Sequence, residues 1–407
     1  MNILPVRILF LSYPCTAQAF GLEGILVSAP MNVYYVTGAT PILSRFSQSS
    51  MTAALLPADP KRPIAYLGSG FEFYAGVADN GLNEGVQPFL TGGSLWDPDS
   101  SSSPAFPRLG AYAFDAREQR RRELVERAAP FNPTMAAALR KALRQISIGD
   151  GAIGFDTYEA RTLLEGAEVK GTLRPADDIM LHIRLVKTGA EIELLRKAAS
   201  NNVDAALMTA KAARQEGTLM DIRQRFFAEA ARHGNVGVFG NVDMVMDERT
   251  DGTLREGQTF MIDFVSHHAF YQGDYGRTVF FGEPDKQPRH ATEVGIAAWR
   301  EIESRLRPGL RFSDIRRIGG ETVKKLGADF MYAFNPHTVG LQHWDQPRMN
   351  LEGKPFDLEL QPGMVLSVDC PLLDAGVNGT THIEDLVLIN ATGSEPLHRQ
   401  GNHFIAV

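Results

Sequence analysis

The chain has 407 residues, of which 44% are hydrophobic and 22% are charged. This composition is typical of a soluble globular protein, and at one domain per ~150 residues the length predicts two domains, or three. The net charge is −7, and no stretch forms a stripe dense in lysine and arginine. Both features argue against nucleic acid as the main partner.

The cysteines and the hydropathy of the chain indicate the cellular compartment in which we expect the protein. Cys15 and Cys370 lie far apart, which excludes a disulfide framework or a thiolate zinc site and fits a reducing compartment. No apolar run approaches the ~18–20 residues of a membrane span. The apolar segment after Arg7 is too short for a secretory signal, and Pro14 interrupts it. We therefore expect a cytoplasmic protein with no membrane partner.

The first half of the chain alternates strand-like and helix-like segments. This alternation predicts a small α/β domain with a mixed sheet over residues 1–183. No catalytic constellation stands out in it, which fits a role in substrate shaping or dimerisation. The predicted strands are 24–28, 32–38, 51–57, 63–68 and 152–156, and the predicted helices are 116–129, 134–146 and a segment from Tyr158.

The second half begins near Arg184 and is predicted to form a second domain, residues 184–407. Thr188 and Glu191 have the spacing of a capping box, so a long helix should begin there and run to about Arg214. Further helices are expected at 220–232, 290–306 and 313–326, with strand-like segments between and after them.

Two aspartates lie in strand-like segments that together predict a β-hairpin. Asp263 and Asp274 are 11 positions apart, and their midpoint falls between His268 and Ala269. If the chain reverses there, the two carboxylates face each other roughly 4.5–5.5 Å apart. Two carboxylates at that distance cannot both stay ionised without a cation between them. The alternative is a solvated hairpin with two unrelated aspartates.

A second pair of acids follows the same logic. Asp369 and Glu384 lie 15 positions apart, on either side of the turn dipeptide Asn378-Gly379. They are therefore predicted to face each other across a second ladder. Burying unpaired acids in apolar strands is costly, so two unrelated coincidences are disfavoured.

A histidine between the two hairpins completes the donor set. His337 stands in AsnProHisThrValGly, positioned by turn residues, and alone it would more often be structural than a ligand. Four carboxylates and one imidazole suit divalent Mn, Co, Fe or Zn. Four negative charges favour two ions, which at ~3.5–4 Å from each other can activate a water and polarise an amide carbonyl.

These motifs resemble the pita-bread metallopeptidase family, in particular its prolidase, aminopeptidase P and creatinase branch. The resemblance covers the chain from about Leu185 to the end, and the first half resembles the N-terminal domain of creatinase and prolidase. It implies an α+β fold, with a creatinase-like N-terminal α/β domain and a C-terminal pita-bread catalytic domain, and a homodimer. The motifs are MetIleAspPhe, GlyAspTyrGlyArgThr, ProHisThrValGly, GlnProGlyMetValLeuSerValAsp and HisIleGluAspLeuValLeu.

The resemblance also implies roles for single residues. His343 would contact the substrate or the tetrahedral intermediate, and Glu384 or the acid at position 369 would relay a proton to the leaving amine. Arg277 and Asp385 would orient the ligand carboxylates, although Arg277 equally fits a surface ion pair on a strand. The implied ligands of two divalent ions (Mn, Co, Fe or Zn) are Asp263, Asp274, His337, Asp369 and Glu384, with Asp274 and Glu384 bridging.

The chain departs from the family pattern at three positions. Asp369 replaces a glutamate and is one methylene shorter. His337 and His343 are 6 positions apart where the family commonly has one more, which implies a shorter loop. The family's other substrate-binding histidine would fall 17 positions before Asp263, where this chain has Met246. A thioether cannot stabilise an oxyanion as an imidazole does.

The leading hypothesis is a dinuclear metal-dependent hydrolase of a small amide or short peptide, similar to an Xaa-Pro dipeptidase. One alternative is a non-peptidase hydrolase or lyase of a small metabolite on the same fold, as in creatinase, and Met246 favours it. The other is a catalytically inactive binding protein. The presence of donors at all five ligand positions argues against that alternative.

Overall fold

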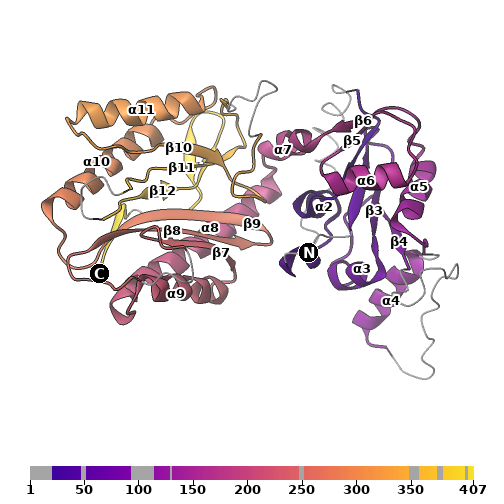
Figure 1. Cartoon of the computed structure of the whole chain (residues 1–407), viewed down its shortest axis with the longest axis horizontal. Helices are drawn as coiled ribbons and strands as arrows, with labels where there is room; N and C mark the ends of the chain where they lie inside the picture. Colours follow the sequence, from indigo (N-terminus) through magenta and orange to yellow (C-terminus); the bar gives the residue numbers. More distant parts are fainter. Residues whose placement is uncertain are drawn as a thin grey trace. The chain divides into compact units, whose positions relative to one another are not determined.

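The computed structural model divides into two compact units, Met1–Ile183 and Arg184–Val407 (Figure 1). Within the described residues, no helix is long and apolar enough to cross a membrane. The structure describes residues 21–46, 52–92, 114–128, 131–246, 252–347, 357–373, 379–398 and 402–407.

The first unit is built on a mixed sheet in the order β4-β3-β2-β1-β5-β6. Strand β1 pairs antiparallel with β2 and parallel with β5, so the predicted mixed α/β architecture is confirmed. Apolar residues of α5 and α6 pack against this sheet. The strands are β1 (Gly24–Val27), β2 (Ala53–Pro57), β3 (Ile64–Ser69), β4 (Val86–Thr91), β5 (Ile153–Phe155) and β6 (Leu173–Pro175). The helices are α2 (Pro30–Thr37), α3 (Gly70–Gly76), α4 (Ala116–Ala128), α5 (Met135–Ile146), α6 (Tyr158–Gly166) and α7 (Asp177–Leu185), whose last two residues belong to the second unit, with a 3₁₀ turn at Leu43–Phe46.

One predicted strand of this unit is wrong. Residues 32–38 lie in helix α2, which begins at Pro30 and ends before Gly38. Gly38 has φ 76° and closes the helix in the left-handed conformation that glycine favours. Residues 32–37 are all buried, and a short helix buried on all sides has the same continuous apolar pattern as a buried strand.

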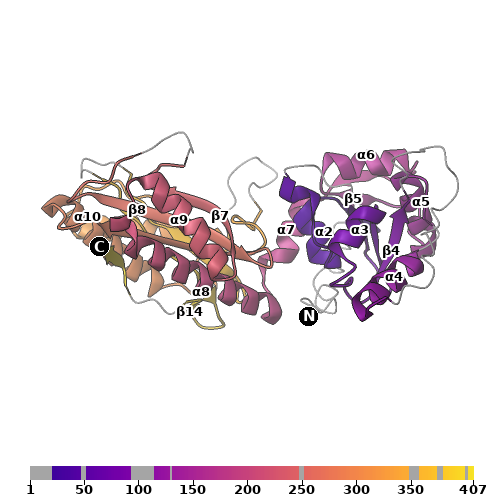
Figure 2. The same ribbon diagram turned by 90° about the horizontal axis from the view of Figure 1, so that it is seen from below.

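The second unit contains two sheets, each covered by its own helices (Figures 1 and 2). Helices α8 and α9 pack on the larger sheet, in the order β12-β9-β8-β7, with β15 also paired to β9. Helices α10 and α11 pack on the smaller sheet, in the order β10-β11-β13-β14. The larger sheet comprises β7 (Val236–Val242), β8 (Thr259–His268), β9 (Tyr271–Phe280), β12 (Ile383–Asp385) and β15 (Phe404–Ala406). The smaller comprises β10 (Asn335–Thr338), β11 (Val365–Asp369), β13 (Val387–Ile389) and β14 (Ser394–Pro396).

The helices of this unit agree closely with the sequence pattern. Helix α8 (Gly189–Lys211) begins with the predicted capping box: the Glu191 N–H donates to Thr188 Oγ1, and the Thr188 N–H donates to the Glu191 carboxylate. It is followed by a short 3₁₀ turn at Ala213–Gln215. The other helices are α9 (Leu219–Arg232), α10 (Lys286–Glu303) and α11 (Phe312–Lys325).

Candidate metal centre

The first pair of acids lies on one face of the β8–β9 hairpin, but not directly opposite each other. Asp263 pairs with Gly276, and Asp274 pairs with Val265. The chain turns at Ala269 and Phe270, both with positive φ, one position later than predicted. Because a one-residue shift of the turn moves every cross-strand partner by two, the acids become diagonal neighbours. The expected direct facing is therefore wrong.

Across three neighbouring strands, a glycine of the middle strand separates the acids of the outer two. Gly276 of β9 pairs with Asp263 of β8 on one side and with Glu384 of β12 on the other. The row across the sheet is therefore acid, glycine, acid. Because glycine has no side chain, no side chain of β9 fills the space between the Asp263 and Glu384 carboxylates.

The second pair of acids has the predicted register, although its strands belong to different sheets. The Cys370 N–H donates to the Ile383 carbonyl oxygen at 3.2 Å, which places the preceding Asp369 opposite Glu384. Strand β12 nevertheless pairs with β9, whereas β11 pairs with β10 and β13. The two sheets thus meet at these acids. Asn378 of the predicted turn lies outside the described residues.

His337 lies at the point where the carboxylates converge. Its Nε2 is 3.7 Å from Asp274 Oδ2, 3.6 Å from Asp369 Oδ1 and 3.6 Å from Glu384 Oε1. These separations are too long for good hydrogen bonds. The Nδ1 atom lies 3.0 Å from the main-chain oxygen of His343, which orients the ring. Three predicted ligands from three strands therefore surround one buried imidazole.

His343 also reaches this cluster, from the loop that follows β10. Its Nε2 lies 2.9 Å from Asp274 Oδ2, and 38% of its side chain is exposed, so it connects the cluster with solvent. The loop is anchored two residues later, where Arg184 and Lys187 both donate to the buried Asp345 carboxylate, at 2.6 and 2.8 Å.

Arg277 and Asp385 form a buried pair beneath the cluster. Arg277 Nη2 donates to Asp385 Oδ1 at 2.5 Å, and its Nη1 donates to the main-chain oxygens of Gly276 and Glu384, both at 2.7 Å. Arg277 has no exposed surface, so the surface ion pair considered above is excluded. Its contacts hold together the backbones of two residues in the central row.

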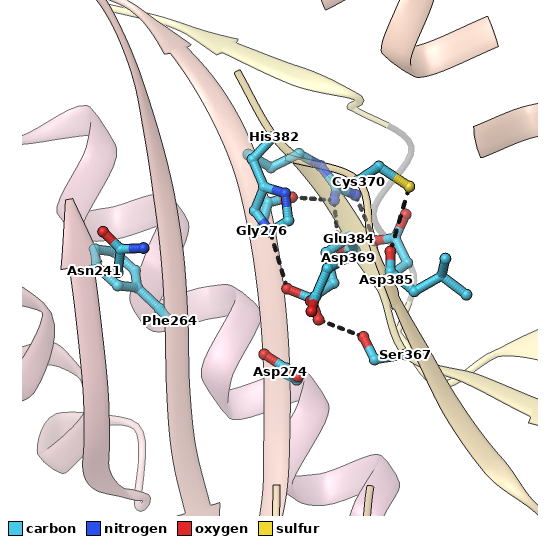
Figure 3. Close-up of polar contacts among 12 residues, drawn as sticks. Asn241, Phe264, Asp274, Gly276, Ser367, Asp369, Cys370, His382, Glu384 and Asp385 are labelled. Carbon is cyan, nitrogen blue, oxygen red and sulfur yellow. Dashed lines mark hydrogen bonds and ion pairs between the residues drawn. The ribbon is translucent and has the colours of Figure 1, made fainter. Parts of the chain in front are cut away.

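Two residues without a predicted role also contact Glu384 (Figure 3). Ser367 Oγ donates to Glu384 Oε1 at 2.6 Å, and His382 Nε2 lies 3.1 Å from Glu384 Oε2. Ser367 and His382 stand two positions before Asp369 and Glu384, respectively. Since alternate residues of a strand share a face, this spacing was the available signal in the sequence.

Met246 is not brought into this cluster by the described contacts. It follows β7 and the turn at Asp243 and Met244, and 41% of its surface is exposed. Strand β7 itself borders the cluster, because Asn241 pairs with Asp263. The structure thus places Met246 a few residues beyond the strand next to the acids, on a solvent-facing segment.

The cluster concentrates negative charge, which shifts the pKa values of its carboxylates and imidazoles. Burial and the charge of Glu384 raise the pKa of Asp263 well above its ordinary value. Burial and Asp274 would also raise the pKa of Glu384, but the imidazoles of His337 and His382 lower it to about 2. Protonated histidines therefore offset the carboxylates in the protein alone, and divalent cations can take over that role.

The arrangement fits divalent metal ions. Among the described residues, buried Asp274 Oδ1 and His337 Nε2 have no hydrogen-bond partner, although buried polar atoms are nearly always paired. Carboxylates and imidazoles are ligands of Mn, Fe, Co and Zn. Three groups each bring one donor atom per residue within 4.8 Å of the others: Asp274, His337 and His343; Asp263, His382 and Glu384; and His337, Asp369 and Glu384.

Comparison with known proteins assigns the chain to a family. The model of metallopeptidase family M24 matches residues 181–391. The Xaa-Pro dipeptidase of Pyrococcus furiosus is 25% identical over 258 residues, which are 61% of this chain and 72% of that protein. The probable dipeptidase PepE of Mycobacterium tuberculosis is 26% identical over 262 residues, 62% of this chain and 69% of that protein.

A solved structure extends the likeness to the whole fold. The prolidase of Pyrococcus horikoshii superposes with a TM-score of 0.70 at 18% identity, covering 98% of this chain and 99% of that one. The resemblance to the pita-bread metallopeptidases and the expected two-part fold are thereby confirmed. The match of the family model spans more than half of the chain and includes every donor residue of the cluster. The chain belongs to metallopeptidase family M24.

Proposed function

We propose that this protein is a dinuclear metal-dependent hydrolase that cleaves Xaa-Pro dipeptides or closely related small amides. The observation that carries the proposal is the convergence of Asp274, Asp369 and Glu384 on His337 Nε2. Asp263 lies in the same cluster through its group with Glu384. The Xaa-Pro dipeptidases and dipeptidases among the relatives support the substrate class.

The charge and layout of the donors support two ions. Four carboxylates require about two divalent cations for neutrality. Glu384 and His337 each take part in two of the three candidate groups. The Glu384 carboxylate is suited to bridging, because its two oxygens lie near different imidazoles. The mixture of carboxylate and imidazole donors favours Mn, Co, Fe or Zn.

The positions of the side chains indicate their roles in catalysis. Bound ions would polarise the scissile carbonyl and lower the pKa of an attacking water. His343, the imidazole with an exposed surface, donates a hydrogen bond to the carbonyl oxygen as the tetrahedral intermediate forms. Asp369 has 21% of its side chain exposed, whereas Glu384 has none. Of the two acids considered for the proton relay, Asp369 is thus better placed to exchange a proton with the leaving amine.

The direct test is a substrate panel on the purified protein loaded with Mn²⁺, Co²⁺, Fe²⁺ or Zn²⁺. We expect hydrolysis of Gly-Pro-type dipeptides, complete loss of activity on chelation, and recovery when the ion is returned. Failure to cleave any Xaa-Pro dipeptide with both sites loaded would contradict the proposed substrate.

Met246 supports a second candidate, a non-peptidase of the same fold acting on a small metabolite. A thioether in place of the substrate-binding histidine removes a group that holds a peptide carbonyl. The same panel, extended to non-peptide amides, decides between the two: turnover of these compounds without dipeptide cleavage would favour the second candidate. The homodimer and the cytoplasmic location stay predictions, and light scattering would test the first of them.

Metal binding should depend steeply on pH. Burial lowers the pKa of an imidazole, but the neighbouring carboxylates more than offset it: they raise the pKa of His337 well above its usual value, raise that of His343, and raise that of His382 to about 9. Protons must leave before ions bind, so affinity should rise with pH by about tenfold per unit for each proton released.

Isothermal titration calorimetry in two buffers of different ionisation enthalpy measures this proton release directly. We expect more than one proton per protein at neutral pH. Affinity that is unchanged between about pH 6 and 8 would show that the imidazoles are already neutral before the ions bind.

A further inference from the structure

We propose that His382 is a metal ligand, so that each of the two ions is bound by its own imidazole. This inference rests on the proposed dinuclear function and adds a sixth donor to the five predicted from the sequence. The ion concerned is the one held by Asp263 and Glu384.

The backbone places the His382 side chain on the ligand face. The His382 N–H donates to Thr278 Oγ1 at 2.9 Å, and the same hydroxyl donates to the His382 carbonyl oxygen at 3.1 Å. The residue lies two positions before Glu384, on the same side of the strand. Its side chain is only 2% exposed, so the ring has a fixed place inside the cluster.

Gly276 provides the space that the ring occupies. A Cβ at this position would lie 2.1 Å from His382 Cδ2 and 2.2 Å from His382 Nε2, far inside van der Waals contact. The ring therefore lies directly over the glycine that separates Asp263 from Glu384 (Figure 3). It fills the gap in the row of acids with a nitrogen donor.

The two oxygens of Glu384 face different imidazoles. Oε1 lies 3.6 Å from His337 Nε2, and Oε2 lies 3.1 Å from His382 Nε2. Two donors bound to one ion at ~2.0–2.2 Å lie about 2.8–3.6 Å apart, from octahedral to tetrahedral angles, so both distances suit an imidazole and a carboxylate oxygen that share an ion. Asp263 completes the group of His382 and Glu384, with donor atoms within 4.8 Å of the others. A bridging Glu384 would then have one imidazole on each side.

This donor set should affect metal preference. Imidazole ligands favour Zn, Fe and Co over ions that prefer oxygen, such as Mg and Ca. With His337 as the single imidazole, the ion at Asp263 would be held by oxygen alone. His382 gives that ion a nitrogen ligand, and we expect the two sites to be more alike in affinity as a result.

The simpler alternative is that His382 only positions Glu384 through a hydrogen bond. Ser367 offers a matched control, because its hydroxyl donates to the other oxygen of the same carboxylate at 2.6 Å. Loss of such an outer contact typically costs about 10–100-fold in metal affinity. Ser367→Ala therefore measures the effect of positioning alone.

The experiment is zinc titration and X-ray absorption spectroscopy of the full chain and its variants. For His382→Ala and His382→Gln we expect weaker binding of one ion than in Ser367→Ala, and one imidazole ligand fewer per protein. Gln can still donate a hydrogen bond to Glu384, so it rescues a positioning role but not a nitrogen ligand. Unfolding curves of the variants check that the fold is kept.

Three results would reject the two proposals separately. If wild type binds two zinc ions, and both His382 variants keep wild-type affinity and imidazole count, His382 is not a ligand although the dinuclear centre stands. If His382→Gln restores what His382→Ala loses, the residue acts only by positioning. If the wild type binds none of Mn²⁺, Co²⁺, Fe²⁺ and Zn²⁺, the proposed function itself fails.

Discussion

Glu384→Gln is expected to abolish hydrolysis and to weaken metal binding strongly. The substitution keeps the size of the side chain but removes one of the charges that attract the ions. In the metal-free protein it also mismatches the contacts of the carboxylate, because both oxygens accept hydrogen bonds, from Ser367 Oγ and His382 Nε2. The amide group of glutamine can accept from only one of them. We expect a fall in kcat/KM larger than the about 10–100-fold that follows loss of an outer partner of a metal ligand.

Activity and metal content should be measured together. Ions at a free concentration of 100 times Kd should stabilise the wild type by about 2.7 kcal/mol for each occupied site, and Glu384→Gln should gain clearly less. Glu321→Gln is a matched control, because Glu321 lies on the surface of α11 with 61% of its side chain exposed. It should change neither quantity. Wild-type metal stoichiometry and rate in Glu384→Gln would contradict the assigned role.

The second large effect is expected for stability. Asp345→Asn should lower the free energy of unfolding by about 3–5 kcal/mol, because removing one member of a buried ion pair leaves the others uncompensated. Arg184 and Lys187 both donate to this carboxylate, and all three side chains are at most 2% exposed. The loop that carries His343 ends at this anchor, so activity should fall as well.

The pKa of Asp345 determines how the stability difference between wild type and Asp345→Asn should change with pH. Burial raises the pKa of Asp345, but Arg184 and Lys187 outweigh it and hold the value below the ordinary one. A lowered pKa in the folded state stabilises the protein above the ordinary value and loses this contribution as the pH falls through the lowered value. The difference between wild type and variant should therefore shrink with acidification.

Urea unfolding of the metal-free protein at neutral pH and at about pH 3 would test this. Glu321→Gln again serves as the control, because exposed ion pairs contribute only about 0–1 kcal/mol. A change below about 1 kcal/mol for Asp345→Asn would show that the buried pairs do not anchor this loop.

Local sequence signals predicted most of the second unit. The capping box at Thr188, the amphipathic helices and the strands that carry the acids all depend on neighbours within a few positions. For a short segment buried on all sides, these local signals do not distinguish a helix from a strand. Residues 32–38 are an example, because burial gives helix α2 the same continuous apolar run that a buried strand has.

The acids within apolar strands, which are rare and costly without a partner, and the family resemblance together predicted five candidate ligands. Their exact partners could not be read from the chain order. The β8–β9 turn is set by the backbone conformation of Ala269 and Phe270, for which no Asn-Gly or Asp-Gly signal exists in the sequence. A shift of one residue at this turn decided that Asp263 faces Gly276 rather than Asp274.

The sequence by itself determined the family, the two-part fold and the kinds of donor available, because these depend on residue types and spacing along the chain. Only the tertiary structure decided that His382 lies over Gly276, that Arg277 is buried, and that Met246 faces solvent. These facts depend on where two separate sheets meet. Contacts between strands distant in sequence follow from packing, so local sequence patterns do not predict them.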